Sequence, residues 1–189
     1  MYLFFDTETT GLPRDYNAPV HNVENWPRMV QIAWLIYDDD GQKLDSKDFI
    51  IKPEGYTIPK NVVDIHNIST VRAMKEGENL SSVLLQFADQ IEKATAMVAH
   101  NINFDEKIVG AEFIRKDIPH QLFQKKRICT MKESTDYCEL PGKYGYKWPN
   151  LSELHMKLFG SDFKEAHNAS IDIEITSKCF WKMKELEII

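Results

Sequence analysis

Apolar runs separated by polar turns divide the first fifty residues into extended segments. Tyr2–Phe5 has the composition of a strand, and Met29–Tyr37 is apolar almost throughout, as in a strand buried on both faces. The acidic turn Asp38–Gly41 precedes a third expected strand at Lys47–Lys52, and the proline-containing segment Gly11–Pro27 is expected to be an extended loop. These segments predict a three-stranded antiparallel meander.

The apolar spacing changes to that of helices after the meander. Short helices are expected over Pro59–Asn67 and from the N-cap Ser69 through Met74. A longer helix is expected from near Asn79, since apolar residues recur on one face at Val83, Leu84, Phe87, Ala88 and Ile91.

Strands and helices alternate in the second half of the chain. Ala96–Ala99 is a predicted strand, a helix follows and ends near Arg115, and residues 125–130 form another predicted strand. Glu139–Pro149 is expected to be a loop, and the remaining two helices begin near Asn150 and Asn168. A meander followed by strands separated by helices predicts an α/β fold, with antiparallel and parallel strands in one mixed sheet flanked by helices.

The composition indicates an ordinary globular protein, with 43% hydrophobic and 28% charged residues. A chain of 189 residues can bury about 70% of its unfolded surface in one core, so a single domain over residues 1–189 is expected. No apolar run approaches the roughly 20 residues of a membrane span, and no basic leader precedes the first strand. Three cysteines without C-x-x-C spacing indicate neither a disulfide framework nor a zinc site. We therefore expect a cytoplasmic protein without membrane contact.

The net charge of −6 argues against a protein that coats nucleic acid through bulk electrostatics. The charge is unevenly distributed, because the segment from Lys107 to Lys147 holds nine basic and five acidic residues. This local excess of +4 leaves −10 for the rest of the chain. A basic surface opposite an acidic one and a mixed solvated surface both fit this distribution.

An acidic pair follows the first strand. Asp6 and Glu8 lie two positions apart, so both side chains share one face if the strand continues through them. Two neighbouring carboxylates at the end of a buried strand repel each other unless a cation or a shifted pKa compensates. A divalent metal ion is the simplest compensation. An isolated pair of this kind also fits a loop cap beside a solvated acid.

Two further carboxylates fall at ends of predicted elements. Asp105 lies in the first turn of the helix after Ala96–Ala99, and Asp172 lies in the first turns of the last helix. Ligand sites of α/β sheets gather beyond strand ends, so these carboxylates and the acidic pair could converge. Carboxylate oxygens suit Mg²⁺ or Mn²⁺, and four of them can hold two ions about 3.5–4 Å apart for displacement at a phosphodiester.

His167 is the candidate general base. It stands five residues before Asp172, and an ordinary imidazole pKa of about 6.5 lets it accept a proton from an attacking water near neutrality. A surface or helix-cap histidine is the alternative interpretation. His100 is interpreted as a structural residue or as a support for the site.

Three motifs in order carry a family resemblance: D-x-E-T-T-G from Asp6, H-N-x-x-F-D from His100, and H-N-A-x-x-D from His167. Together they resemble the DnaQ-like 3′–5′ exonucleases, in the histidine-containing subgroup of the DEDD superfamily, which includes the proofreading epsilon subunit of bacterial DNA polymerase III and stand-alone relatives. The resemblance extends from Phe4 to Asp172 and so covers most of the chain.

The resemblance implies an RNase H-like fold and a metal-dependent enzyme. Two divalent ions, Mg²⁺ or Mn²⁺, would be bound by Asp6, Glu8, Asp105 and Asp172, and His167 would deprotonate the attacking water. The expected reaction releases nucleoside 5′-monophosphates from the 3′ end of single-stranded or frayed DNA.

The resemblance also implies residues that hold the 3′-terminal nucleotide. The segment after the acidic pair would contact it, with Leu12 as a wedge against the last base. The segment Ile65–Ser69 resembles the H-G-I-T element of the family, with Asn67 in place of glycine, and Gln31 stands where relatives often have glutamate. The implied substrate-binding set is Thr9, Thr10, Gly11, Leu12, His66, Ile68, Asn101 and Phe104, although Phe104 and Leu12 also fit a hydrophobic core.

Two alternative functions stay open at this point. An RNA-directed exonuclease of the same superfamily would share every motif, and a non-catalytic polymerase-associated subunit would share the fold. The chain has no long C-terminal extension like the one by which the epsilon subunit binds its polymerase, which favours a free-standing enzyme. The tract Lys143–Trp148 alternates cations with aromatic rings, as a single-strand binding surface would, or it covers the sheet.

Overall fold

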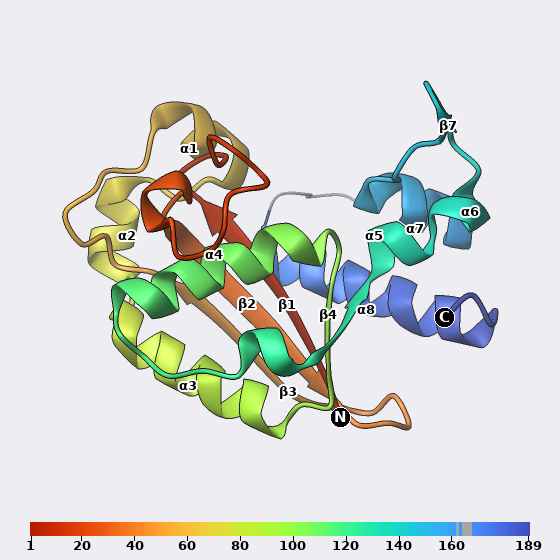
Figure 1. The fold of residues 1–189 in the computed structure, drawn as a ribbon, viewed down its shortest axis with the longest axis horizontal. Helices are drawn as coiled ribbons and strands as arrows, with labels where there is room; N and C mark the ends of the chain where they lie inside the picture. Colours follow the sequence, from red (N-terminus) through yellow and green to blue (C-terminus); the bar gives the residue numbers. More distant parts are fainter. Residues whose placement is uncertain (162, 164–167) are drawn as a thin grey trace.

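The computed structural model describes residues 1–161, 163 and 168–189 (Figure 1). Its centre is a five-stranded sheet in the order β3-β2-β1-β4-β5. The strands are β1 Tyr2–Thr9, β2 Met29–Tyr37, β3 Lys43–Ile50, β4 Ala96–Ala99 and β5 Lys126–Cys129. β1, β2 and β3 form an antiparallel meander, and β4 and β5 run parallel to β1. The predicted mixed α/β sheet is confirmed.

Helices cover both faces of this sheet (Figure 1). α3 (Leu80–Lys93) and α4 (Ile102–Arg115) lie on one face, and α8 (Ala169–Glu185) crosses the other. Successive side chains of β1 alternate between the two layers. The ring of Phe5 lies 5.5 Å from that of Phe87 on α3, while the ring of Phe4 lies 5.1 Å from that of Phe180 on α8. This alternation fixes which helix each later residue of β1 faces.

Shorter elements surround the sheet. The 3₁₀ turns are η1 Val23–Asn25 and η2 Leu122–Gln124, and the short helices are α1 Lys60–His66, α2 Thr70–Glu76, α5 Thr130–Glu133, α6 Thr135–Cys138 and α7 Leu151–Phe159. Side chains cap four of the described helices near their predicted starts, including α8, where Asn168 accepts from Ser170 N. Ser69 accepts from Arg72 N, Asn79 accepts from Ser82 N, and Asn150 forms a capping box with Glu153.

Two local predictions were wrong. The third strand is Lys43–Ile50 rather than Lys47–Lys52, because its polar first half pairs with β2 as an exposed edge strand, where burial does not select apolar residues. The segment Glu139–Pro149 contains a two-stranded hairpin, β6 (Pro141–Gly142) paired with β7 (Gly145–Tyr146), rather than only loop. None of the described helices combines the length and apolar character that a membrane crossing requires.

Candidate metal centre

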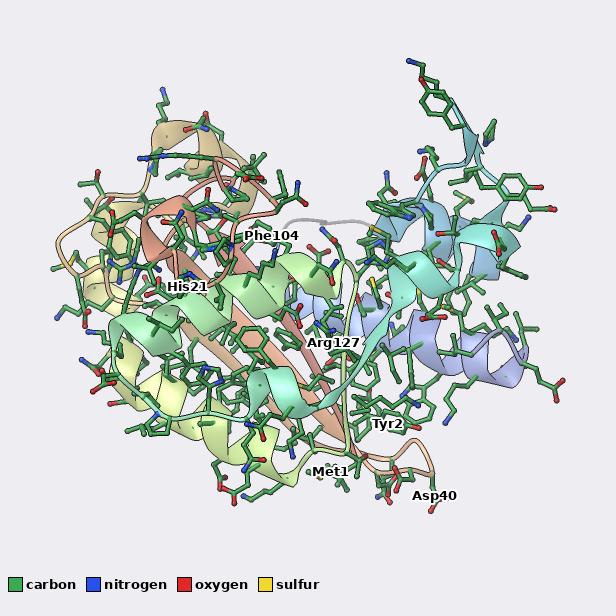
Figure 2. All side chains as sticks on the ribbon, viewed as in Figure 1. Met1, Tyr2, His21, Asp40, Phe104 and Arg127 are labelled. Atoms are coloured by element: carbon green, nitrogen blue, oxygen red, sulfur yellow. The ribbon has the colours of Figure 1, made fainter. Side chains whose placement is uncertain are left out.

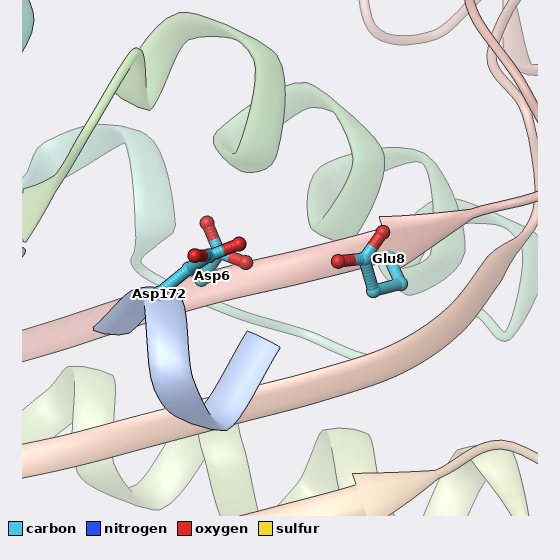
Figure 3. A group of neighbouring side chains, drawn as sticks. All are labelled: Asp6, Glu8 and Asp172. Carbon is cyan, nitrogen blue, oxygen red and sulfur yellow. The ribbon is translucent and has the colours of Figure 1, made fainter. Parts of the chain in front are cut away.

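Three carboxylates from two distant segments meet beside β1 (Figure 3). Asp6 and Glu8 project from β1, and Asp172 projects from the first turn of α8. Each residue offers one carboxylate oxygen, and these three oxygens lie within 4.8 Å of one another. The expected convergence of these three residues is therefore observed.

The packing of α8 on β1 explains this meeting. Phe4, Asp6 and Glu8 alternate along β1 with residues of the other face, so all three point toward α8. The contact between Phe4 and Phe180 holds the helix against the strand. The N-terminal turn of α8 consequently lies over the end of β1 that carries the acidic pair.

Asp105 adjoins this group: its charge is the largest of those acting on Asp6, although it is not among the three residues whose oxygens all lie within 4.8 Å of one another. Pairing of β1 with β4 ends at Phe4 and Val98, so the backbone of the second half of β1 is free to bond elsewhere along that edge. Thr7 uses this freedom: its backbone N donates to Asp105 Oδ1 at 3.1 Å, and its Oγ1 donates to the same oxygen at 2.7 Å. Asp105 is buried, and its charge acts on Asp6 and Glu8.

Burial raises the pKa of Asp6, Glu8 and Asp105, and repulsion within the cluster adds to the shifts of Asp6 and Glu8. Burial, followed by the charges of Asp172 and Asp105, raises the pKa of Glu8 to about 8. Burial and then the charges of Asp105, Asp172 and Glu8 raise the pKa of Asp6 well above its ordinary value. Burial raises the pKa of Asp105 to about 7, although both hydrogen bonds from Thr7 act in the opposite direction. At neutral pH the cluster must hold protons or bind a cation.

A cavity of about 270 Å³ opens next to the carboxylates. Its wall includes Asp6, His100, Asn150, Leu151, Ser152, Phe163 and Asp172. His100 is held by both ring nitrogens, with Nδ1 3.0 Å from Thr130 Oγ1 and Nε2 3.1 Å from the carbonyl oxygen of Pro149. Burial lowers the pKa of His100 to about 4, so the ring is neutral near pH 7. His100 therefore joins the start of α4 to the segment before α7 and lines the site.

The donor set fits a hard divalent cation. Asp6, Glu8 and Asp172 supply oxygen atoms only, which suits Mg²⁺ or Mn²⁺ better than Zn²⁺. A cation among them would also remove the repulsion that raises the pKa values of Asp6 and Glu8.

The segment after the acidic pair lies at the surface beside the site. Thr10 is held by Arg28, whose backbone N donates to Thr10 Oγ1 at 3.0 Å, and Thr9 Oγ1 donates to the carbonyl oxygen of Gly11 at 2.6 Å. Gly11 has φ +150°, and a Cβ there would meet no atom within 4 Å. The side chain of Leu12 is 72% exposed. An ordered backbone therefore presents an exposed apolar side chain four positions after Glu8.

The other predicted substrate-binding residues occupy different environments. His66 is buried at the end of α1, where burial lowers its pKa and its Nδ1 accepts a hydrogen bond from Ile68 N at 3.1 Å. Ile68 is buried in a small core with Val30 and Val62. Asn101 begins α4 in the left-handed conformation, and Phe104 on α4 packs partly against the main core (Figure 2). His167 lies outside the described residues.

Thr7 is one of the residues at this site that sequence reasoning missed, together with Asn150, Leu151, Ser152 and Phe163 of the cavity wall. Thr7 stands between Asp6 and Glu8, and the strand alternation that places those two together places Thr7 on the other face. That alternation was the available signal. No local sequence pattern indicated the partner of Thr7, because Asp105 lies 98 positions away in the sequence.

Comparison with known proteins identifies the family. A model of the RNase T type, described as "Exonuclease", matches residues 3–180. The chain belongs to this exonuclease family. The resemblance drawn from the three motifs is thus confirmed.

The chain spans about a tenth of the length of the polymerases that it matches and less than half of a solved structure with a similar fold. The PolC-type DNA polymerase III of Streptococcus pneumoniae is 30% identical over 179 residues, which cover 94% of this chain and 11% of the polymerase. The Lactococcus lactis PolC-type polymerase is 27% identical, over 97% of this chain and 10% of the polymerase. Exonuclease I of E. coli in complex with a dA16 oligonucleotide has a TM-score of 0.74 at 21% identity, over 97% of this chain and 40% of that one. This likeness supports the predicted RNase H-like fold.

Proposed function

We propose that this protein is a metal-dependent 3′–5′ exonuclease that releases nucleoside 5′-monophosphates from single-stranded or frayed DNA. The observation that carries the proposal is the meeting of Asp6, Glu8 and Asp172, whose carboxylate oxygens lie within 4.8 Å of one another in a member of an exonuclease family. The raised pKa values of Asp6 and Glu8 indicate a site that is short of positive charge.

The proposed metal ligands are Asp6, Glu8, Asp172 and Asp105. Two ions, Mg²⁺ or Mn²⁺, would neutralise charge on the scissile phosphate and on the attacking and leaving oxygens. Thr7 is a positioning residue, because its two hydrogen bonds orient the Asp105 carboxylate. His100, neutral and held on both sides, keeps the cavity wall in place without competing for protons.

His167 is the proposed general base. It directly precedes Asn168, the N-cap of α8, and lies five positions from Asp172 in the sequence. In this role its neutral imidazole accepts a proton from the attacking water near pH 7.

The proposed position of the 3′-terminal nucleotide is next to Leu12. The exposed Leu12 side chain offers an apolar surface for the last base. Support for a single-stranded DNA substrate comes from E. coli Exonuclease I, which has been solved with dA16 and dT13 oligonucleotides. The likeness to PolC-type polymerases supports a DNA polymerase as a partner of this protein. Three buried, unpaired cysteines support a reducing, cytoplasmic location.

The test is digestion of a 5′-labelled single strand by wild-type protein and by Asp172→Asn. Wild type with Mg²⁺ should shorten the strand one nucleotide at a time from its 3′ end, and the variant should lose nearly all of this activity while it keeps its fold. Glu92→Gln, which removes an exposed carboxylate on α3, is the matched control and should remain active.

Matched DNA and RNA strands in the same assay decide the nucleic acid. Undiminished cleavage by Asp172→Asn would remove Asp172 from the site. Equal or faster digestion of RNA would contradict the proposed DNA specificity but would leave the proposed metal site unchanged.

A further inference from the structure

The hairpin β6–β7 presents large aromatic side chains to solvent. Tyr144 at its tip is 91% exposed, Trp148 just after it is 61% exposed, and Tyr146 on β7 is 51% exposed. The hairpin extends away from the sheet and from α8, and its side chains spread outward (Figures 1 and 2). Rings kept in water contribute little to folding, so this composition needs another explanation.

The hairpin is an ordered element. Lys147 N donates to the carbonyl oxygen of Leu140 at 2.9 Å, and Gly142 pairs with Gly145. A Cβ on Gly142 would lie 2.8 Å from the carbonyl oxygen of Gly145, so glycine is required for this close approach. The rings are therefore carried on a formed support, which lowers the entropy cost of binding a ligand.

Cations accompany the rings. Lys143 Nζ lies 5.0 Å from the centre of the Tyr144 ring, and Lys132 Nζ lies 5.7 Å from that of Trp148. Lys147 instead pairs with Glu153 at 2.5 Å. The segment from Lys107 to Lys147 carries a net charge of +4 in a chain of net charge −6. Alternating rings and cations fit a polyanion with stacked bases better than they fit an apolar partner.

The hairpin is continuous with the wall of the carboxylate cavity. Trp148 is followed by Pro149, whose carbonyl oxygen is held by His100, and then by Asn150, which lines the cavity together with Asp6 and Asp172. An extended backbone from Asn150 to Tyr144 spans at most about 20 Å. A stacked strand rises about 3.4 Å per nucleotide, so about six nucleotides cover this distance.

We propose that the hairpin binds the single-stranded DNA upstream of the 3′ end, with bases stacked on Tyr144 and Trp148 and phosphates near Lys143 and Lys132. This inference rests on the proposed function, which places the 3′ end at the carboxylates. The hairpin would hold a strand long enough to reach it and would leave a mononucleotide unaffected.

The test measures binding and chemistry separately. Fluorescence anisotropy in a metal chelator gives the Kd for a labelled single strand of about 16 nucleotides, a length at the upper end of known site sizes. The double variant Tyr144→Ala/Trp148→Ala should raise this Kd by roughly 10-fold or more for each ring lost. Tyr144→Phe/Trp148→Phe keeps the rings and should retain the affinity, and Leu85→Ala, at an exposed site on α3, is the matched surface control.

Hydrolysis of the p-nitrophenyl ester of thymidine 5′-monophosphate, assayed with Mg²⁺, reports on the carboxylate site alone. The double alanine variant should hydrolyse it at the wild-type rate. Unchanged affinity for the long strand in that variant, or loss of ester hydrolysis together with affinity, would overturn the inference. If wild type cleaves neither the ester nor DNA but the difference in Kd holds, the proposed function fails and the binding surface stands.

Discussion

Glu8→Gln should stabilise the metal-free protein while it removes activity. The substitution replaces one carboxylate of the cluster by a neutral group of similar size. Burial and the charges of Asp172 and Asp105 raise the pKa of Glu8 from 4.5 to about 8 in the folded protein. A raised folded-state pKa means that stability is fully present below the unfolded value and is lost as pH rises through the folded value.

The size of this effect follows from the two pKa values of Glu8. With a pKa of 4.5 in the unfolded chain and about 8 in the folded protein, ionisation of Glu8 lowers the free energy of unfolding by about 3 kcal/mol at pH 7. At pH 5 it lowers it by less than about 1 kcal/mol. The glutamine amide of the variant does not titrate, so the free energy of unfolding of the variant should exceed that of wild type by up to these amounts. Titration shared with Asp6 and Asp105 spreads the change over a wider pH range.

Urea unfolding at pH 5, 7 and 8 in a chelator measures the difference in unfolding free energy, with Glu92→Gln as the exposed control. Saturating Mg²⁺ should stabilise wild type by about 2.7 kcal/mol at 100 times its Kd and should stabilise Glu8→Gln less, since one ligand is gone. The advantage of the variant should therefore narrow or reverse with metal. Equal stability of the two proteins at every pH in chelator would refute the electrostatic reasoning.

Two further predictions concern the base and the fold. His167→Ala should lower turnover by about 10²–10⁴-fold with little change in the Kd for single-stranded DNA; weaker binding at unchanged turnover would make His167 a binding residue. Gly77→Ala should destabilise the protein by about 3 kcal/mol in urea unfolding, because its Cβ would lie 2.3 Å from the carbonyl oxygen of Ala73 and 2.6 Å from Lys52 N. An unchanged unfolding midpoint would show that this backbone can move aside.

Local periodicity predicted most of the elements correctly. The capping residues Ser69, Asn79 and Asn150 mark the observed helix starts, and the apolar run of β2 is a buried strand. The polar start of β3 escaped prediction because backbone pairing with β2, rather than side-chain burial, makes it a strand. The hairpin β6–β7 escaped for the same reason, since its two-residue strands have no apolar alternation.

The sequence by itself determined which acidic residues were candidates for the site and half of their geometry. The period-two alternation of a strand is a property of the backbone, so Asp6 and Glu8 had to share a face once β1 formed. Tertiary structure decided the rest. Packing of Phe180 on Phe4 brings Asp172 to that face, and the end of β4 pairing frees Thr7 to bind Asp105. Contacts between distant segments, and the burial that raises the pKa values of these acids, depend on how whole elements pack, which no local pattern encodes.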